Sequence, residues 1–368
     1  MKIGYPRAVH YYDYFPFWAG FFRGLDLELV TSPLTNRKVL ERGLKKASDD
    51  TCLPIKLLTG HIQALGELKV DALFLPRMVS VEARTYLCPK LLGLPESVLT
   101  AVPEGLRILT LDLNARHGQR QVWRALREFA VSLGKTPAEA RQGYMLAQTW
   151  QKRYESMRRE GRSFIESMSE FDPRLLGEVR KPEPTETSDS STGAKRSQFE
   201  DRAAAPLAVG RILDSARSES NRMLKIALVG HSYLTQETYA NLNLVKKLEE
   251  RAEVRFIEEV MPATIAEGLQ GLRKSMFWSH ARKILGAGIS YVHNEAVDGI
   301  IYLTCFGCGT DSMSQDMVAR IARQQHKPYM VLTLDEHSGE AGLVTRLEAF
   351  LDMTERRAFY ESDLSAHG

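Results

Sequence analysis

The sequence has only four cysteines in 368 residues, too few for a disulfide scaffold. It also lacks an apolar run long enough to cross a membrane, because Asp13, Lys90 and Glu96 interrupt the best candidates. The opening Met-Lys-Ile-Gly-Tyr-Pro has no apolar signal-peptide core, so we expect a cytoplasmic protein with no membrane partner. The thiols are then left for metal binding, redox chemistry or core packing.

Signatures of nucleotide and nucleic-acid binding are missing as well. The sequence has no Gly-x-Gly-x-x-Gly or Walker motif, so we do not expect the chain to bind and hydrolyse ATP itself. Its 49 basic and 46 acidic residues leave a formal charge of +3, and no basic block is interleaved with aromatic residues, which argues against a nucleic-acid partner. A hydrophobic content of 43% supports a large core, and the length favours two domains.

Short apolar runs alternate with helical patterns in both halves of the chain. This alternation is typical of α/β domains in which helices cover both faces of a parallel sheet. The predicted strands are residues 2–5, 27–31, 70–76, 106–113, 224–229, 297–304 and 329–334. We therefore expect two doubly wound parallel-sheet domains.

The chain divides into four regions by composition and periodicity. We assign an N-terminal α/β domain to residues 1–118, a helical segment to 119–179, a flexible linker to 180–206 and a C-terminal α/β domain to 207–368. The linker is rich in Pro, Ser, Thr and charge, and cannot bury enough apolar surface to order itself. The second domain is expected to open with a helix over residues 207–221.

The two halves show a weak internal repeat. Lys2-Ile3 and Lys225-Ile226 each begin a strand that ends near a glycine, while Val70-Asp71 and Val297-Asp298 each begin an inner strand that is followed by cysteine. Ligands of open α/β sheets bind at the carboxyl ends of the strands. We therefore expect a site in the crevice between the two domains.

The cysteines lie in turns rather than in the middle of apolar runs. After the strand that begins at Val297, the chain turns through Cys305-Phe-Gly-Cys308-Gly into a helix that Asp311 or Ser312 can cap. Cys52 lies at or just before a helix that begins near Pro54, because proline is favoured in a first helical turn. Cys88 precedes proline in a predicted loop over residues 77–95.

This spacing leaves several kinds of site open. A lone cysteine is often a buried small hydrophobe. Cys305 and Cys308 resemble a zinc knuckle, and four thiolates would close a tetrahedral zinc site, although Cys52 and Cys88 do not form a second knuckle. Single cysteines near proline together with a Cys-x-x-Cys suit an iron–sulfur cluster equally well. A redox dithiol at Cys305 and Cys308 is the remaining alternative.

A series of motifs, in order along the chain, resembles one protein family. They are Gly-Tyr-Pro-Arg-Ala, Tyr-Phe-Pro-Phe-Trp, Cys52-Leu-Pro-Ile-Lys56, Gly60-His61, Phe74-Leu-Pro-Arg77, Cys88-Pro-Lys-Leu-Leu-Gly-Leu-Pro95, Gly230-His231-Ser-Tyr, Phe306-Gly-Cys-Gly-Thr-Asp-Ser312, Asp335-Glu-His-Ser-Gly-Glu-Ala-Gly and Thr345-Arg-Leu-Glu-Ala-Phe350. The family comprises proteins related to the 2-hydroxyacyl-CoA dehydratase and benzoyl-CoA reductase subunits. Within that family, the motifs resemble those of the uncharacterised branch labelled CoA-enzyme activase or acyl-CoA dehydratase activase-related.

The resemblance implies two flavodoxin-like or Rossmann-like domains with an oxygen-sensitive iron–sulfur cluster in their cleft. It implies that Cys52, Cys88 and Cys308 bind the cluster, with Cys305 as a further candidate that the family motif does not match. One 4Fe-4S cluster per chain is expected, because a double-cubane cluster usually needs more cysteines. Two chains could pair as a homodimer.

In that family a separate ATP-hydrolysing iron–sulfur activator protein delivers a low-potential electron to the cluster. The implied function is a low-potential reductase or an acyl-CoA dehydratase-like lyase, anaerobic, with an acyl-CoA or another small molecule as substrate. The alternative is a zinc-stabilised or metal-free binding protein without redox chemistry.

Several other polar residues are candidates for the same site. His61 and His231 could hydrogen-bond sulfide or a substrate carbonyl as catalytic residues, or serve as structural partners. Lys56 and Arg77 could offset the charge of a cluster or bind phosphate, or form ordinary ion pairs. Residues 335–337, Asp-Glu-His, fit helix capping and a domain contact better than a hard-metal site.

Overall fold

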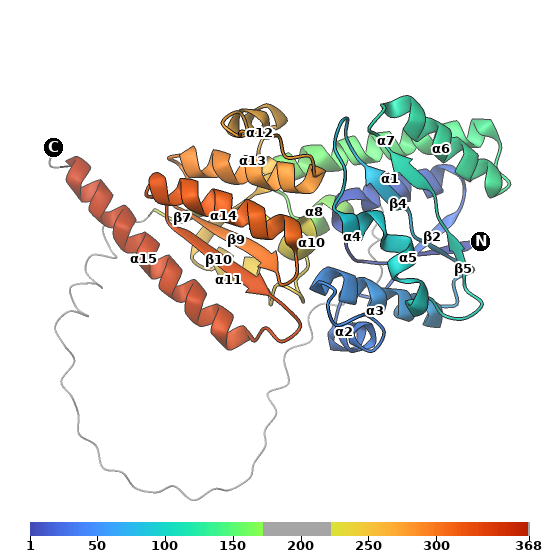
Figure 1. The fold of residues 1–368 in the computed structure, drawn as a ribbon, viewed down its shortest axis with the longest axis horizontal. Coiled ribbons are helices and arrows are strands. Elements are labelled where there is room, and N and C mark those ends of the chain that lie inside the picture. Colours follow the sequence, from blue (N-terminus) through green and yellow to red (C-terminus); the bar gives the residue numbers. More distant parts are fainter. Residues whose placement is uncertain (172–221, 367–368) are drawn as a thin grey trace, which may run out of the picture.

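The computed structural model describes residues 1–171 and 222–366, with side chains described as far as Phe359. The predicted linker over residues 180–206 and the predicted helix over 207–221 lie outside the described residues. The described parts form two α/β halves that pack side by side, each built on a parallel sheet with helices around it (Figure 1). The fold class is the one that the sequence predicts.

The first half is built on a four-stranded parallel sheet in the order β2-β1-β3-β5. Its strands are β1 (Lys2–Tyr5), β2 (Glu28–Thr31), β3 (Ala72–Phe74) and β5 (Arg107–Leu109), and its connecting helices are α1 (Tyr11–Gly24), α2 (Arg37–Leu44) and α3 (Leu53–Glu67). Asn36 caps α2 by accepting a hydrogen bond from the Val39 amide.

The second half repeats this topology in the order β10-β9-β7-β8. Its strands are β7 (Leu224–Gly230), β8 (Ala252–Phe256), β9 (Gly299–Cys305) and β10 (Tyr329–Leu334). Its helices are α10 (Ser232–Thr235), α11 (Leu244–Glu249), the 3-10 turn η3 (Ile257–Glu259), α12 (Pro262–Gly268), α13 (Ser279–His293), α14 (Gly309–Gln324) and α15 (Glu340–Ala366). Counted in chain order, the paired strands of both sheets lie in the order 2-1-3-4, which is a flavodoxin-type arrangement.

Corresponding hydrogen bonds confirm the internal repeat. The Lys2 amide donates to the Asp71 carboxylate at 2.7 Å, and the Lys225 amide donates to the Asp298 carboxylate at 2.7 Å. The amides of Asp71 and Asp298 return hydrogen bonds to the carbonyls of Lys2 and Lys225, at 2.9 and 2.8 Å. In each half, one aspartate thus ties the start of the first strand to the start of the inner strand.

The stretches 77–95 and 106–113 differ from the prediction. The first is not a plain loop, because it contains β4 (Arg77–Ser80), α4 (Pro89–Leu92) and α5 (Leu94–Ser97), and the 3-10 turn η1 (Leu99–Ala101) follows. The second is not one strand: β5 pairs in the main sheet, and β6 (Asp112–Asn114) pairs with β4 in a separate two-stranded sheet. These strands have three or four residues and find their partner about thirty-five positions away, so local periodicity cannot reveal them.

The helical segment packs against the first sheet domain. It consists of α6 (Gln119–Ser132), α7 (Pro137–Arg159) and α8 (Phe164–Ser169), and α7 lies along α1. The two helix backbones approach closely at two glycines, since a Cβ placed on Gly24 would lie 2.5 Å from the Cα of Gly143. The chain breaks between α6 and α7, and Thr136 and Glu139 form a capping box at the start of α7.

Aromatic side chains of α1 form the core of the first half. Trp18 and Phe22 pack edge-to-face on Phe74 of β3, with ring centroids 4.8 and 4.9 Å apart. Burying one such ring stabilises the fold by about 1.5–3 kcal/mol. Most residues of α1 are buried. Among the described helices, none is long and apolar enough to span a membrane.

Candidate metal centre

The four cysteines occur where strands end and helices begin. Cys305 is the last residue of β9, and Cys52, Cys88 and Cys308 are the N-cap residues of α3, α4 and α14. Cys52 and Cys88 have nearly the same backbone conformation, with φ −70° and −63° and ψ 154° and 153°. A helix amino terminus carries partial positive charge, so these three positions favour anionic sulfur.

The Cys-x-x-Cys turn of the second half lies against the cysteine turns of the first half. Gly307, at φ +79°, faces Cys52 so closely that an added Cβ would lie 4.0 Å from the Cα of Cys52. Lys90 reaches across, and its Nζ donates to the Asp50 carbonyl at 3.5 Å and to the Gly307 carbonyl at 3.4 Å. Each domain therefore contributes two thiols to one place at their interface.

Hydrogen bonds between the thiols distribute their protons unequally. The buried Cys305 thiol donates to the sulfurs of Cys308 and Cys52, and these hydrogen bonds raise its own pKa well above the ordinary value. The hydrogen bond from Cys305 lowers the pKa of Cys52 to about 7, against the opposing effect of burial. The same donor, helped by His231, lowers the pKa of Cys308 to about 5. Cys52 and Cys308 are therefore the thiols predisposed to act as anionic ligands.

Cys88 completes the group at longer range. Its charge interacts with those of Cys52, Cys308 and His231, but burial dominates and raises the pKa of its thiol. Cys88 and Cys308 are half-buried, whereas Cys52 and Cys305 are buried. Between the two thiols of the second half, the Phe306 side chain is 75% exposed. The centre therefore has one side toward solvent.

His231 follows β7 and lies beside Cys308, between the ends of the two central strands of the second sheet. Its Nε2 is 3.2 Å from the Asp311 carboxylate. Burial alone would lower the pKa of His231, but the charge of Asp311 and the neighbouring Cys308 sulfur raise it well above its usual value. His231, Cys308 and Asp311 place one donor atom each within 4.8 Å of one another.

Asp311 does not cap α14, so that prediction is wrong. The helix begins at Gly309 with Cys308 as N-cap, and Asp311 is buried in the first turn. Its carboxylate accepts hydrogen bonds from Thr304 at 3.0 Å and Tyr302 at 3.2 Å, in addition to its contact with His231. The residue type that suggests a cap thus serves here as the partner of a buried histidine.

His61 lies in a different network from the thiols. Its Nδ1 is 2.9 Å from the Ser32 hydroxyl and its Nε2 is 3.0 Å from the Thr35 hydroxyl. Thr35 donates to Glu237 at 2.6 Å, so it must accept from His61, which makes His61 a neutral Nε2–H imidazole. Burial agrees with this assignment, because it lowers the pKa of His61 to about 3. Both ring nitrogens have partners here, which favours the structural alternative for this residue.

The other charged candidates form ion pairs. Lys56 Nζ is 2.5 Å from Glu336 of the second half, and this nearly buried pair is a domain contact of the predicted kind. Asp335 accepts hydrogen bonds from Ser338 at 2.9 Å and from the His337 amide at 3.0 Å, which shapes the turn before α15. Arg77 pairs with Asp112 at 3.3 Å and also with Glu96.

Sequence reasoning missed two residues close to the centre. His280, at the start of α13, packs edge-on against His231 with ring centroids 5.7 Å apart, and its Nε2 is 3.4 Å from the Tyr14 hydroxyl. Burial lowers the pKa of His280 to about 4 and raises that of Tyr14, so both side chains are neutral. An isolated histidine and a tyrosine within an aromatic run give no local signal of this contact.

The donor set fits a metal centre with soft ligands. Four sulfurs from two domains, three of them at helix amino termini, suit iron in a cluster or zinc, both of which bind thiolate. Lys90 and His231 supply positive charge beside the sulfurs. The residues present are therefore compatible with the cluster that the resemblance implies.

Comparison with known families gives one match. Residues 2–261 match the family described as CoA enzyme activase uncharacterised domain (DUF2229). The matched range includes Cys52, Cys88 and His231, whereas Cys305 and Cys308 lie beyond it. No curated protein matches the chain.

Proposed function

Because the chain belongs to the CoA enzyme activase uncharacterised domain family, we propose that it is an iron–sulfur redox protein that serves a CoA-dependent enzyme system. The observation that carries this proposal is the meeting of Cys52 and Cys88 with Cys305 and Cys308 at the domain interface. Isolated cysteines that merely fill space have no reason to gather at turns from both domains. Soft ligands so arranged suit one 4Fe-4S cluster.

Cys52, Cys88 and Cys308 would hold the cluster, and Cys305 would be the fourth or an exchangeable ligand. When bound, such a cluster supplies one electron at low potential. The chain's own groups prepare the place for it. The amino termini of α3 and α14 and the Lys90 ammonium offset negative charge, while Asp311 orients His231 toward Cys308.

The electron would come from a separate ATP-hydrolysing iron–sulfur activator protein, since this sequence carries no nucleotide-binding motif. The proposed substrate is an acyl-CoA or another small molecule that is hard to reduce, and the reaction is a reduction or an acyl-CoA dehydratase-like elimination. Cytoplasmic conditions would keep the free thiols reduced.

Purification of the full chain without oxygen tests the proposal. We expect brown protein with about four iron atoms and about four sulfides per chain, and an EPR signal after chemical reduction. Colourless protein that contains neither iron nor sulfide after cluster reconstitution would overturn it.

A zinc site is the second candidate, favoured by the close approach of His231, Cys308 and Asp311. Zinc accepts this mixture of imidazole, thiolate and carboxylate ligands. Protein of this kind would be colourless and contain about one zinc per chain. An Asp311→Asn variant would then lose zinc, whereas an iron–sulfur protein with sulfur ligands would keep its iron.

A further inference from the structure

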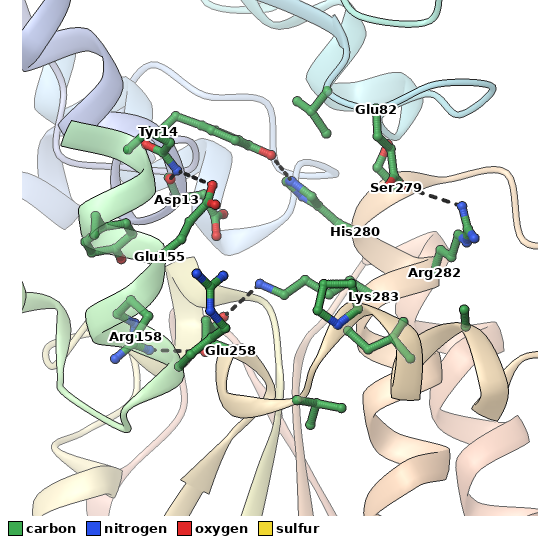
Figure 2. Close-up of a pocket in the computed structure, with 18 residues that line it drawn as sticks. Asp13, Tyr14, Glu82, Glu155, Arg158, Glu258, Ser279, His280, Arg282 and Lys283 are labelled. Carbon is green, nitrogen blue, oxygen red and sulfur yellow. Dashed lines mark hydrogen bonds and ion pairs between the residues drawn. The ribbon is translucent and has the colours of Figure 1, made fainter. Parts of the chain in front are cut away.

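A cavity of about 420 Å³ lies between the domains, and one of its lining residues, His280, packs against His231. Its walls come from α1, α7, α12, α13 and η3 and from the segment after β4, so both halves of the molecule contribute (Figure 2). In Figure 2 the Tyr14 and His280 side chains meet along one wall, and Arg158, Glu258 and Lys283 lie together along another. The cavity therefore has two chemically different ends.

The Tyr14–His280 end presents a phenol and an imidazole next to the candidate metal centre, and the carboxylates of Asp13 and Glu155 also line the cavity. His280 lines the cavity, and its ring also packs on His231, which contacts Cys308. The Nδ1 atom of His280 is buried and has no hydrogen-bond partner among the described residues. A neutral imidazole and a phenol are suited to hydrogen-bond a carbonyl or hydroxyl oxygen.

At the other end of the cavity, two cationic side chains contact a single carboxylate. Arg158 is only 2% exposed and donates to Glu258 at 3.1 Å, while Lys283 Nζ is 3.4 Å from the same carboxylate. Two cations therefore share one carboxylate. The Nε of Arg158 is buried and has no hydrogen-bond partner among the described residues. An unused donor on a buried guanidinium is costly unless a ligand or water completes it.

We propose that this cavity binds a small molecule that carries an anionic group toward Arg158 and Lys283 and a carbonyl or hydroxyl oxygen toward Tyr14 and His280. We further assign this molecule as the one on which the thiol centre acts, and this second assignment rests on the proposed function. The link between cavity and centre runs through His280, which packs on His231, and His231 lies beside Cys308.

Calorimetric titration of the full chain, purified without oxygen, tests the binding site with four matched compounds. Levulinate carries both a ketone and a carboxylate, its methyl ester lacks the charge, pentanoate lacks the ketone, and dihydroxyacetone phosphate replaces the carboxylate with phosphate. We expect levulinate or dihydroxyacetone phosphate to bind about tenfold more tightly than the ester. Tighter binding of the phosphate or of the carboxylate identifies which anion the natural ligand carries.

Variants locate the two ends. Lys283→Gln should weaken levulinate about tenfold and leave the methyl ester unchanged, because it removes one charge-assisted contact. Tyr14→Phe and His280→Phe should each weaken the binding of levulinate and leave the binding of pentanoate unchanged. If His280→Phe does not fold, Tyr14→Phe still tests this end, because it removes only a hydroxyl. Arg320→Gln, on exposed α14 surface and ion-paired with Asp316, is the control and should change nothing.

The outcomes separate this inference from the proposed function. Protein that stays free of iron after cluster reconstitution, yet binds levulinate through Lys283 and His280, would refute the iron–sulfur proposal and leave the cavity assignment standing. Iron-loaded protein that binds neither anion at millimolar concentration, or binds one regardless of the variants, would overturn the cavity assignment. An EPR signal that levulinate shifts in the wild type and not in His280→Phe would link cavity and centre, and an unchanged signal despite binding would refute that link.

Discussion

The two halves of the molecule share a sheet order and the hydrogen bonds at the start of the sheet, yet the turns after their first strands carry different residues with different roles. After the first strand of the first half, the buried Arg7 donates to Thr31 at 2.9 Å and supports the fold. After the first strand of the second half, His231 instead faces Cys308 and Asp311. The comparison shows that the second half carries the polar chemistry of the centre, while the first half supplies two separate thiols.

The largest expected effect comes from replacing the cysteines that the two halves contribute to the centre. In the proposed iron–sulfur centre, each of the variants Cys52→Ser, Cys88→Ser and Cys308→Ser should lose most of the bound iron. Serine removes a soft anionic ligand at nearly constant volume. Cys305→Ser should retain more iron, since Cys305 lies outside the set of cysteines that the family motif matches and is proposed as an exchangeable ligand. Iron and sulfide analysis of the four variants measures this.

Two results would change the ligands or the role assigned to the proposed iron–sulfur centre. Equal loss of iron in all four variants would indicate a closed centre with four thiolates, which suits electron transfer better than substrate activation. Full iron in the Cys52 or Cys88 variant would refute a centre shared between the halves.

Asp311→Asn tests the polar pair that belongs to the second half. Removing the charge leaves His231 buried without its counter-ion, and we expect a loss of about 3 kcal/mol in the free energy of unfolding at pH 6. Urea denaturation measures this. The matched control is Asp316→Asn on the exposed side of the same helix, which should change stability by about 0.5 kcal/mol or less.

The pH dependence of that loss has a defined sign. The folded-state pKa of His231 is raised, so its stabilisation is fully present below the unfolded value of about 6.5 and is lost as pH rises through the folded value. The difference between wild type and Asp311→Asn should therefore shrink at alkaline pH. A difference that grows with pH would show that His231 is neutral in the folded protein.

Lys56→Met weakens the contact between the halves and not the centre itself. The variant leaves Glu336, 15% exposed, without its partner, and removes a donor from the Asp49 carbonyl. We expect a loss of about 2 kcal/mol, less than for a fully buried pair because Glu336 can reach water. The matched control is Lys135→Met, because Lys135 pairs with Glu139, which is 40% exposed. Thermal unfolding measures the stability of both variants, and equal losses of stability would contradict a domain-coupling role for Lys56.

Gly24→Ala tests the packing of α1 against α7 in the first half. A methyl group there would meet the Gly143 backbone at 2.5 Å and force α1 and α7 apart, at a cost of about 1.5 kcal/mol. Gly342→Ala in α15 has open space and should instead stabilise the protein by about 0.5 kcal/mol. Chemical denaturation of both variants would reveal the opposite signs, and a neutral Gly24→Ala would mean that the two helices can separate freely.

The local sequence was sufficient to predict helix starts and strands that depend on neighbouring residues alone. Prolines just after Cys52 and Cys88 indicate that a helix begins at each thiol, and the apolar run before Cys305 indicates a central strand. The role of Asp311 was not predictable in this way, because its partner His231 is 80 residues away in sequence and the cap pattern gave a plausible local alternative. The same limit hid His280 and the β4–β6 pair, whose contacts form only when distant segments meet.

The exposed Phe306 ring has a consequence for how electrons could reach the sulfurs. Gly307 and the Lys90 bridge fix the turn that carries this ring, so it stands in water between the two thiols of the second half. A protein that docked over the half-buried Cys88 and Cys308 would cover it and expel the water around it. Dehydration destabilises the extra negative charge of a reduced centre, so a complex of this kind would make the stored electron more reactive while the partner stays bound.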